Sequence, residues 1–153
     1  MLSIAHTLAS LPFGVYLQNP LLILILTFAF HLFLDTLLHW NIYPRDFKRY
    51  PFLLVALDVG GGLLVAWLLL GTDIFLSAPI IAAIIGGNLP DVLHAFWEFL
   101  SPSQQTRLPK LIQGFFHFHH DLQRETNDIA RGLVSQVIIV ALSIILLLIP
   151  PLK

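Results

Sequence analysis

The chain has 153 residues, of which 57% are hydrophobic and 11% are charged, whereas soluble domains carry roughly 45–50% apolar and about 25% charged residues. Its net charge of −1 gives no electrostatic reason to expect a nucleic-acid partner. Because it has no cysteine, disulfides, thiolate nucleophiles and cysteine-bound zinc are excluded, and any metal must be held by histidine or oxygen ligands. We therefore expect an integral membrane protein, in which seven histidines need an explanation.

Long apolar segments follow one another along the chain and predict an all-α fold, a polytopic bundle of transmembrane helices in a single integral-membrane domain. A helix that spans a bilayer needs about 20 mostly apolar residues. The predicted spans are residues 2–18, 20–40, 51–70, 74–99 and 129–149. The first is short, so the alternative to five spans is four. Residues 108–123 alternate apolar and polar side chains at helical spacing, which predicts one amphipathic helix at the cytoplasmic membrane interface.

Lysine and arginine residues predict the orientation of this bundle. They occur in residues 41–50 and in or next to residues 101–128, whereas the turn at residues 71–75 has none. Because cytoplasmic loops carry an excess of basic residues, both polar stretches are expected on the cytoplasmic side of the inner membrane. With five spans, the start of the first span and its residue His6 lie on that side too.

The 20–40 segment carries His31, Asp35 and His39 at four-residue spacing. On a helix these positions drift by only about 40° per step, so the three side chains share one face. Ionisable groups inside a membrane are unfavourable by several kcal/mol unless they are paired, hydrated or metal-bound. Histidine and carboxylate four residues apart can reach one divalent ion, and we predict all three as metal ligands. The alternative is a hydrogen-bond network between helices.

The 74–99 segment is interrupted by Gly86-Gly87-Asn88-Leu89-Pro90, which predicts a break in the helix at mid-span. Broken backbone at membrane depth is tolerated only where it lines a cavity or is buried in protein. Asp91 and His94 follow at i, i+3 spacing, and we predict both as metal ligands. The alternative is that Asn88 merely caps the resumed helix.

A third group of polar residues lies in the amphipathic segment, where histidines and an aspartate occupy positions 117 to 121. On a helix, His117, His120 and Asp121 face one way and His119 faces another. We predict the first three as metal ligands and give His119 no role. The alternative is the polar face of a surface helix, for which histidines are well suited.

In the predicted topology these polar groups lie at one depth, together with the intramembrane carboxylate Asp58. A cysteine-free site at the lipid–water boundary suits a divalent ion, with zinc as the first choice and manganese or iron as alternatives. Such an ion lowers the pKa of bound water and polarises a phosphoryl or carbonyl oxygen. Asp58 or Glu98 would then serve as general base, and Arg124 would bind a phosphate oxygen.

Three features resemble the membrane-bound metal-dependent hydrolases of the LexA-regulated type. They are the N-terminal His6-Thr7, the intramembrane Leu89-Pro90-Asp91-x-x-His94 and the later His-rich stretch, in a small multi-span chain. The resemblance implies a metal-dependent hydrolase. The second aspartate of the family's Pro-Asp-x-Asp-His motif is leucine here, so Asp35 or Asp58 would supply that carboxylate. The family's later His-Arg-x-x-Thr-His-Ser element is replaced by residues 117–121.

The sequence therefore predicts a membrane-embedded hydrolase that acts at the cytoplasmic face on a lipid or a lipid-linked ester or phosphoester, with a homo-oligomer as one option. The first alternative is a membrane di-iron oxidase or hydroxylase, which also gathers histidines. The second is an ion or proton transporter, for which intramembrane ionisable residues and the broken helix are the evidence. The third is a structural membrane subunit whose polar network only fixes packing.

Overall fold

The computed structural model describes residues 1–42 and 53–149, and these residues form seven helices. In chain order they are α1 (Ser3–Tyr16), α2 (Pro20–Asp35), α3 (Leu53–Phe75), α4 (Ala78–Phe99), α5 (Pro102–Gln105), α6 (Lys110–Leu122) and α7 (Ile129–Leu148). The prediction of an all-α fold is confirmed for this part of the chain. Part of the predicted orientation depends on Arg45, Lys48 and Arg49, and these three residues lie outside the described residues.

Three of the described helices, α3, α4 and α7, are long and apolar enough to cross a bilayer, so the chain is a membrane protein. The helices α1 and α2 have 14 and 16 residues. Both are shorter than the roughly 20 residues that a spanning helix needs. The choice between four and five spans is therefore not decided by helix length, because α1 and α2 are apolar but short.

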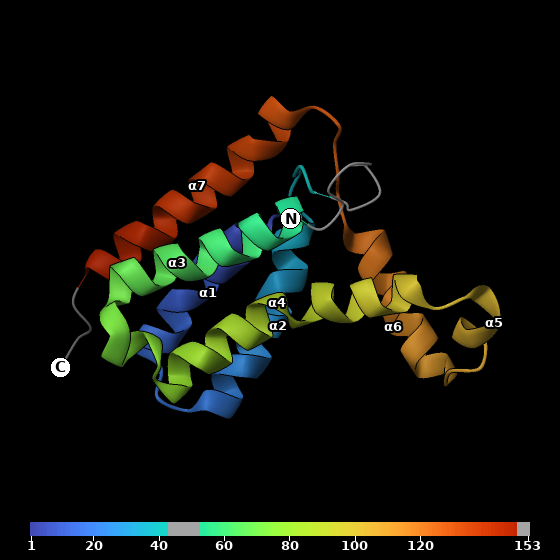
Figure 1. Cartoon of the computed structure of the whole chain (residues 1–153), viewed down its shortest axis with the longest axis horizontal. Coiled ribbons are helices and arrows are strands. Elements are labelled where there is room, and N and C mark those ends of the chain that lie inside the picture. Colours follow the sequence, from blue (N-terminus) through green and yellow to red (C-terminus); the bar gives the residue numbers. More distant parts are fainter. Residues whose placement is uncertain (43–52, 150–153) are drawn as a thin grey trace.

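The helix α1 lies at the centre of the fold and contacts α2, α3, α4 and α7. Every residue from Ala5 to Pro12 is buried. Figure 1 shows α3 and α7 running alongside α1, whereas α2 and α4 cross each other next to it. The helices α5 and α6 project to one side of this bundle, and α6 contacts both α2 and α4. Side chains from α1, α2, α4 and α6 can therefore meet in one place.

Two chain features fix where α2 and α3 begin or bend. The side chain of Asn19 accepts hydrogen bonds from the amides of Leu21 and Leu22, and Pro20 occupies the first helical position, a combination that favours a helix start. In α3 the backbone of Gly71 has a φ of 72°, which only glycine adopts readily, and the helix kinks there. The predicted end of this span at residue 70 therefore coincides with a real change of direction.

The helix α2 ends at Asp35, so the prediction that it continues to residue 40 is wrong. The backbone beyond it is extended and pairs with the segment that follows α6. The amide of His39 donates to the carbonyl of Arg124 (3.0 Å), and the amide of Thr126 donates to the carbonyl of His39 (2.9 Å). The amide of Arg124 donates to the carbonyl of Asp35 at the end of α2 (2.9 Å). These hydrogen bonds hold the end of α6 against the end of α2.

The helix α4 continues through residues 86–90, so the predicted break is wrong. The two glycines are instead contact points between helices. A Cβ atom on Gly86 would overlap Thr27 of α2, and one on Gly87 would overlap Ser10 of α1. Small residues let membrane helices approach closely. The Gly86-Gly87 pair thereby brings α4 against both neighbours, one turn before Asp91.

Polar side chains join α1 to α4 beside this contact. Asn88 does not cap a helix start, because it lies inside α4. Its side-chain nitrogen donates to the Thr7 hydroxyl (3.0 Å) and to the carbonyl of Ile84 (2.9 Å). Its oxygen accepts a hydrogen bond from the Ser3 hydroxyl (2.7 Å). These bonds set the register of α1 along α4.

The start of α1 is satisfied by side chains from other helices. The first backbone amides of a helix have no partner within the helix, and inside a membrane water does not replace one. The amides of Ser3 and Ile4 donate to the two carboxylate oxygens of Asp58 on α3, at 2.7 and 3.0 Å. The amide of Leu2 donates to the side-chain oxygen of Gln136 on α7 (3.0 Å). Asp58 thus fixes the position of the start of α1 along α3.

Candidate metal centre

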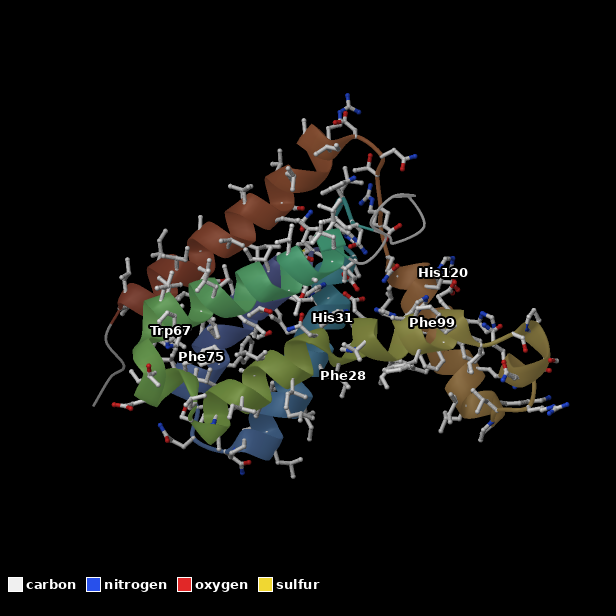
Figure 2. The ribbon with its side chains drawn as sticks, viewed as in Figure 1. Phe28, His31, Trp67, Phe75, Phe99 and His120 are labelled. Carbon is white, nitrogen blue, oxygen red and sulfur yellow. The ribbon has the colours of Figure 1, made fainter. Side chains whose placement is uncertain are left out.

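Four ionisable side chains meet where α2, α4 and α6 come together. His31 and Asp35 come from α2, Asp91 from α4 and His119 from α6, and one ligand atom of each lies within 4.8 Å of all the others. His31, Asp35 and His119 are buried, whereas the Asp91 side chain is 30% exposed. Figure 2 shows His31 near the middle of the molecule, close to where α2 and α4 cross. We call these four residues the metal group.

The distances within the metal group suit one ion. Asp35 Oδ2 lies 3.0 Å from His31 Nε2 and 3.2 Å from His119 Nε2. Asp91 Oδ1 lies 3.5 and 3.7 Å from the same two nitrogens, which are 3.4 Å apart. Four ligands that bind zinc tetrahedrally at about 2.0–2.1 Å are separated from one another by about 3.3–3.4 Å. The metal group could therefore hold a metal ion with little movement.

The second ring nitrogen of His31 is also engaged. Its Nδ1 lies 2.8 Å from the carbonyl oxygen of Gly87, which can only accept a hydrogen bond. Nδ1 therefore carries a proton, and Nε2, which faces the carboxylates, is the nitrogen that could bind an ion. Metal-ligating histidines commonly donate their other N–H in this way, which fixes the ring and its tautomer. The close approach of α4 at Gly87 thus also positions His31.

His94 lies next to His119 and is not one of the four residues of the metal group. The Nδ1 atoms of the two rings are 3.1 Å apart, a hydrogen-bond distance. The Nε2 atom of His94 is 3.6 Å from Glu98 Oε1, and the Glu98 side chain is 59% exposed. A line of polar groups therefore runs from His119 through His94 to the surface. His94, which we predicted as a direct ligand, thus lies beside His119 and not among the four ligand atoms of the metal group.

His119, to which we assigned no role from the sequence, belongs to the metal group. Phe116 and His119 are the two buried residues of α6, three positions apart on one face. The Phe116 ring stacks on Trp97 of α4, with centroids 4.7 Å apart, and this contact turns that face inward. The ligands predicted from α6 are exposed on the outside instead: His117, His120 and Asp121. The side of α6 that faces the bundle is therefore the one with Phe116, and not the one with His117, His120 and Asp121. His119 lies on the inward side because it follows Phe116 by three positions, about one helical turn.

His39 also lies outside the metal group, because α2 ends before it and the four-residue spacing no longer applies. It is buried in the extended segment after α2, where its Nδ1 is 2.8 Å from the carbonyl of Leu37. Its Nε2 is 3.9 Å from Glu125 Oε1. Burial lowers the pKa of the His39 imidazole below its ordinary value.

The three residues predicted to act on substrate lie around the metal group. Asp58 binds the start of α1, as described above. Glu98 lies next to His94 and lines the same cavity as Asp91. The Arg124 side chain is exposed, while its backbone joins the ends of α2 and α6. The general-base and phosphate-binding roles stay predictions.

His6 of α1 joins the metal group from the other side. Its side chain is fully buried, and its Nε2 lies 3.2 Å from Asp35 Oδ1. The His6 ring stacks on that of His31, with centroids 3.8 Å apart and planes 19° from parallel. His6 therefore lies next to His31 and Asp35, although it is far from them in the sequence.

A cavity of about 580 Å³ borders the metal group. Its polar lining includes Asp58, Asn88, Asp91 and His94. Its walls are mainly apolar side chains of α3 and α4: Val55, Val59, Leu63, Ile84, Ile85, Leu89 and Val92. Asp91 belongs to both the cavity and the metal group. A ligand with a polar end and an apolar body would fit this lining.

Comparison of the chain with protein-family models, with curated proteins and with solved structures yields no match. The class of protein is therefore defined by the fold and the site alone. The chain is an all-helical membrane protein with a buried His/Asp group that could hold a metal ion.

Proposed function

We propose that this protein is a membrane-embedded metal-dependent hydrolase that acts on a lipid or a lipid-linked ester or phosphoester. One observation carries the proposal: Asp91 belongs to the metal group and also lines a cavity of about 580 Å³ with mainly apolar walls. A site for an ion and a site for an amphiphilic molecule thus share a side chain. The resemblance of the sequence to membrane-bound metal-dependent hydrolases agrees with this proposal.

The donor set of the metal group suits a divalent ion. It consists of two histidine nitrogens and two carboxylates, and their spacing favours zinc, while manganese and iron accept the same donors. When bound, and with a water or substrate oxygen as a fifth ligand beside the four side chains, such an ion would activate water near neutral pH and polarise a phosphoryl or carbonyl oxygen. Asp91 would orient the substrate from the cavity side. His94 and Glu98 would carry a proton from His119 to the surface.

The cavity favours an amphiphilic substrate over a water-soluble one. Its apolar walls come from α3 and α4, two of the helices that are long enough to span a bilayer. An acyl chain could therefore enter from the membrane, with its head group next to Asp58, Asn88 and Asp91. The basic residues of the polar stretches favour the cytoplasmic face of the inner membrane as the side on which the reaction takes place. In this arrangement α1 and α2 complete a five-helix bundle, and α6 is its interfacial helix.

The transporter alternative rested on intramembrane ionisable residues and on a broken helix at residues 86–90. Because α4 is continuous there, the second of these supports is absent, and the first is shared with the hydrolase. The di-iron oxidase alternative shares the histidine-rich interior, and it predicts bound iron with an absorption band in the visible region.

The proposal is tested with protein purified in detergent and loaded with zinc or manganese, in mixed micelles of phosphatidic acid, a phosphodiester lipid or a diacyl ester. We expect hydrolysis of at least one of these lipids. Asp91→Asn should reduce the rate by about 100-fold or more, because an uncharged amide is a poor ligand for a divalent ion. Ser103→Ala on the exposed helix α5 is the matched control and should keep the full rate.

A second variant separates the cavity from the metal group. Val59→Trp would fill the cavity from α3 without touching a ligand, and should slow hydrolysis of a long-chain lipid more than that of a short-chain analogue. If metal-loaded protein hydrolyses none of the lipids, or if Asp91→Asn is as active as the natural chain, the proposed function is wrong.

A further inference from the structure

Each of the two carboxylates in the metal group has a second oxygen that points away from His31 and His119. Asp35 Oδ2 and Asp91 Oδ1 are the oxygens that face those two histidines. The other oxygens, Asp35 Oδ1 and Asp91 Oδ2, lie 3.2 and 3.8 Å from His6 Nε2. Each aspartate therefore has one oxygen nearest to His31 and His119 and the other nearest to His6.

His6 has no hydrogen-bond partner among the described residues for either of its ring nitrogens, although its side chain is fully buried. A buried polar atom without a partner is rare in folded proteins and requires an explanation such as a missing ion. The Nε2 atom is close to both aspartates, yet its geometry does not make a hydrogen bond to either. A ligand that lies between the nitrogen and the two oxygens would satisfy all three.

The stacked rings of His6 and His31 set the distance between the two positions. Their centroids are 3.8 Å apart and their planes are nearly parallel. The Nε2 atoms of the two rings approach opposite oxygens of the same carboxylate, Asp35. Ions bound to these two nitrogens would be separated by about the ring spacing. Two-metal hydrolytic sites hold their ions about 3.5–4 Å apart.

We propose that the protein binds a second divalent metal ion, held by His6 Nε2, Asp35 Oδ1 and Asp91 Oδ2, with the two aspartates bridging it to the ion of the metal group. The inference rests on the proposed function and gives it a two-metal site. The first ion has four protein ligands. The second has three, which leaves positions open for water or substrate, as in catalytic metal sites.

The surroundings of the second position agree with a place next to substrate. Met1 lines the cavity, and its terminal nitrogen, an ammonium, forms a 3.0 Å ion pair with Asp35 Oδ1, the oxygen on the His6 side. Asp91 lines the same cavity. A carboxylate oxygen has two lone pairs, so Asp35 Oδ1 can accept this hydrogen bond and still bind an ion. Two ions at this end would clamp a phosphoryl oxygen better than one, which favours phosphoesters among the candidate substrates.

The test is the number of ions bound per chain, measured by elemental analysis after loading with Mn²⁺ or Zn²⁺ and removal of free ions. We expect two ions in the natural chain, one in His6→Gln, one in His119→Gln and none in Asp35→Ala. His39→Gln is the matched control, since it changes a buried histidine outside both positions, and it should still bind two. The thermal unfolding temperature of each variant in detergent reports whether it is folded.

Electron paramagnetic resonance of the natural chain loaded with Mn²⁺ gives an independent readout that needs no variant. Two bridged Mn²⁺ ions should give the spectrum of an exchange-coupled pair, and folded His6→Gln should give that of an isolated ion. One uncoupled ion per chain, unchanged by His6→Gln, would overturn the second position and leave the proposed function standing. No bound ion in the natural chain would overturn both.

Discussion

The outer helices α3 and α7 differ from the central helix α1 in what their side chains contact. Within their most apolar 18 residues, only 11% of α3 and 17% of α7 is buried inside the protein. In α1 every residue from Ala5 to Pro12 is buried, including His6, Thr7 and Ser10. The most apolar helices thus form the surface, and a helix with more polar residues forms the interior.

This difference is what a bilayer imposes. Lipid is as apolar as leucine, so apolar side chains gain nothing by leaving the surface, whereas ionisable ones must find partners inside. The interior is accordingly held together by glycine contacts and hydrogen bonds, and it contains the metal group. Substitutions on the surface and in the interior should therefore have different effects, which range from loss of membrane insertion to a small change in acid sensitivity.

A charge on the outer surface should be the most disruptive change. Ile138 lies in the middle of α7 and is 53% exposed. An arginine near the centre of a membrane helix is unfavourable by about 2.5–3.5 kcal/mol on insertion scales. We expect Ile138→Arg to lower the membrane-inserted fraction of the protein, as measured by membrane fractionation. Ser103→Arg on α5 is the control, and equal insertion of the two variants would contradict a lipid-facing α7.

Adding one methyl group should have opposite effects inside and outside. At Gly87 it would overlap Ser10, so Gly87→Ala should destabilise the protein by about 1–3 kcal/mol in a detergent unfolding assay. Gly61 has nothing within 4 Å of the added atom, and Gly61→Ala should be neutral or stabilising by about 0.5–1 kcal/mol, because alanine favours a helix. Equal effects at the two glycines would show that α4 does not approach α1 as described.

Asp58→Asn should separate a structural role from a catalytic one. The carboxylate accepts hydrogen bonds from the amides of Ser3 and Ile4, and an asparagine can replace only part of this interaction. We expect a loss of about 1–2 kcal/mol in the free energy of unfolding. If stability is unchanged while lipid hydrolysis is lost, Asp58 acts as the general base and not as the anchor of α1.

The smallest expected effect is on how the unfolding temperature falls at acidic pH, and it involves His39. Burial lowers the pKa of His39 in the folded protein below its unfolded value of 6.5, so the folded state favours the neutral ring. The stabilisation that this provides is present above pH 6.5 and is lost as the pH falls through the lower folded pKa. His39→Gln should therefore flatten part of the decline in unfolding temperature between pH 7 and pH 4. An identical decline in the variant would assign the acid sensitivity to other groups.

The apolar segments could be located from sequence because their length is set by the bilayer, but their ends could not all be found. The repeat from His31 to His39 resembles a continuing helix. The backbone after Asp35 instead pairs with residues around Arg124, which are far away in the sequence. Likewise Gly86 and Gly87 predict a break when taken alone, and they are contact points because Thr27 and Ser10 lie opposite them in the folded chain.

For the site, spacing shows which residues share a face, but not which face turns inward. His31, Asp35 and Asp91 were predicted as ligands, and the structure brings them together. His119 was missed because the orientation of α6 depends on the contact between Phe116 and Trp97, which joins two helices. If Phe116 had been placed on the inward face of α6, the helical spacing of three residues would have placed His119 on that face as well.

Neighbouring histidines on α6 provide the most direct test of the metal group. His119 is fully buried among the carboxylates, and His120 is exposed one residue further along. We would purify the natural chain, His119→Ala and His120→Ala in detergent without chelator and measure bound metal by elemental analysis. We expect the same metal content in the natural chain and in His120→Ala, and the loss of the ion of the metal group in folded His119→Ala, which leaves at most the ion at His6. A metal content in folded His119→Ala equal to that of the natural chain, or no metal in the natural chain after reconstitution, would contradict the metal group.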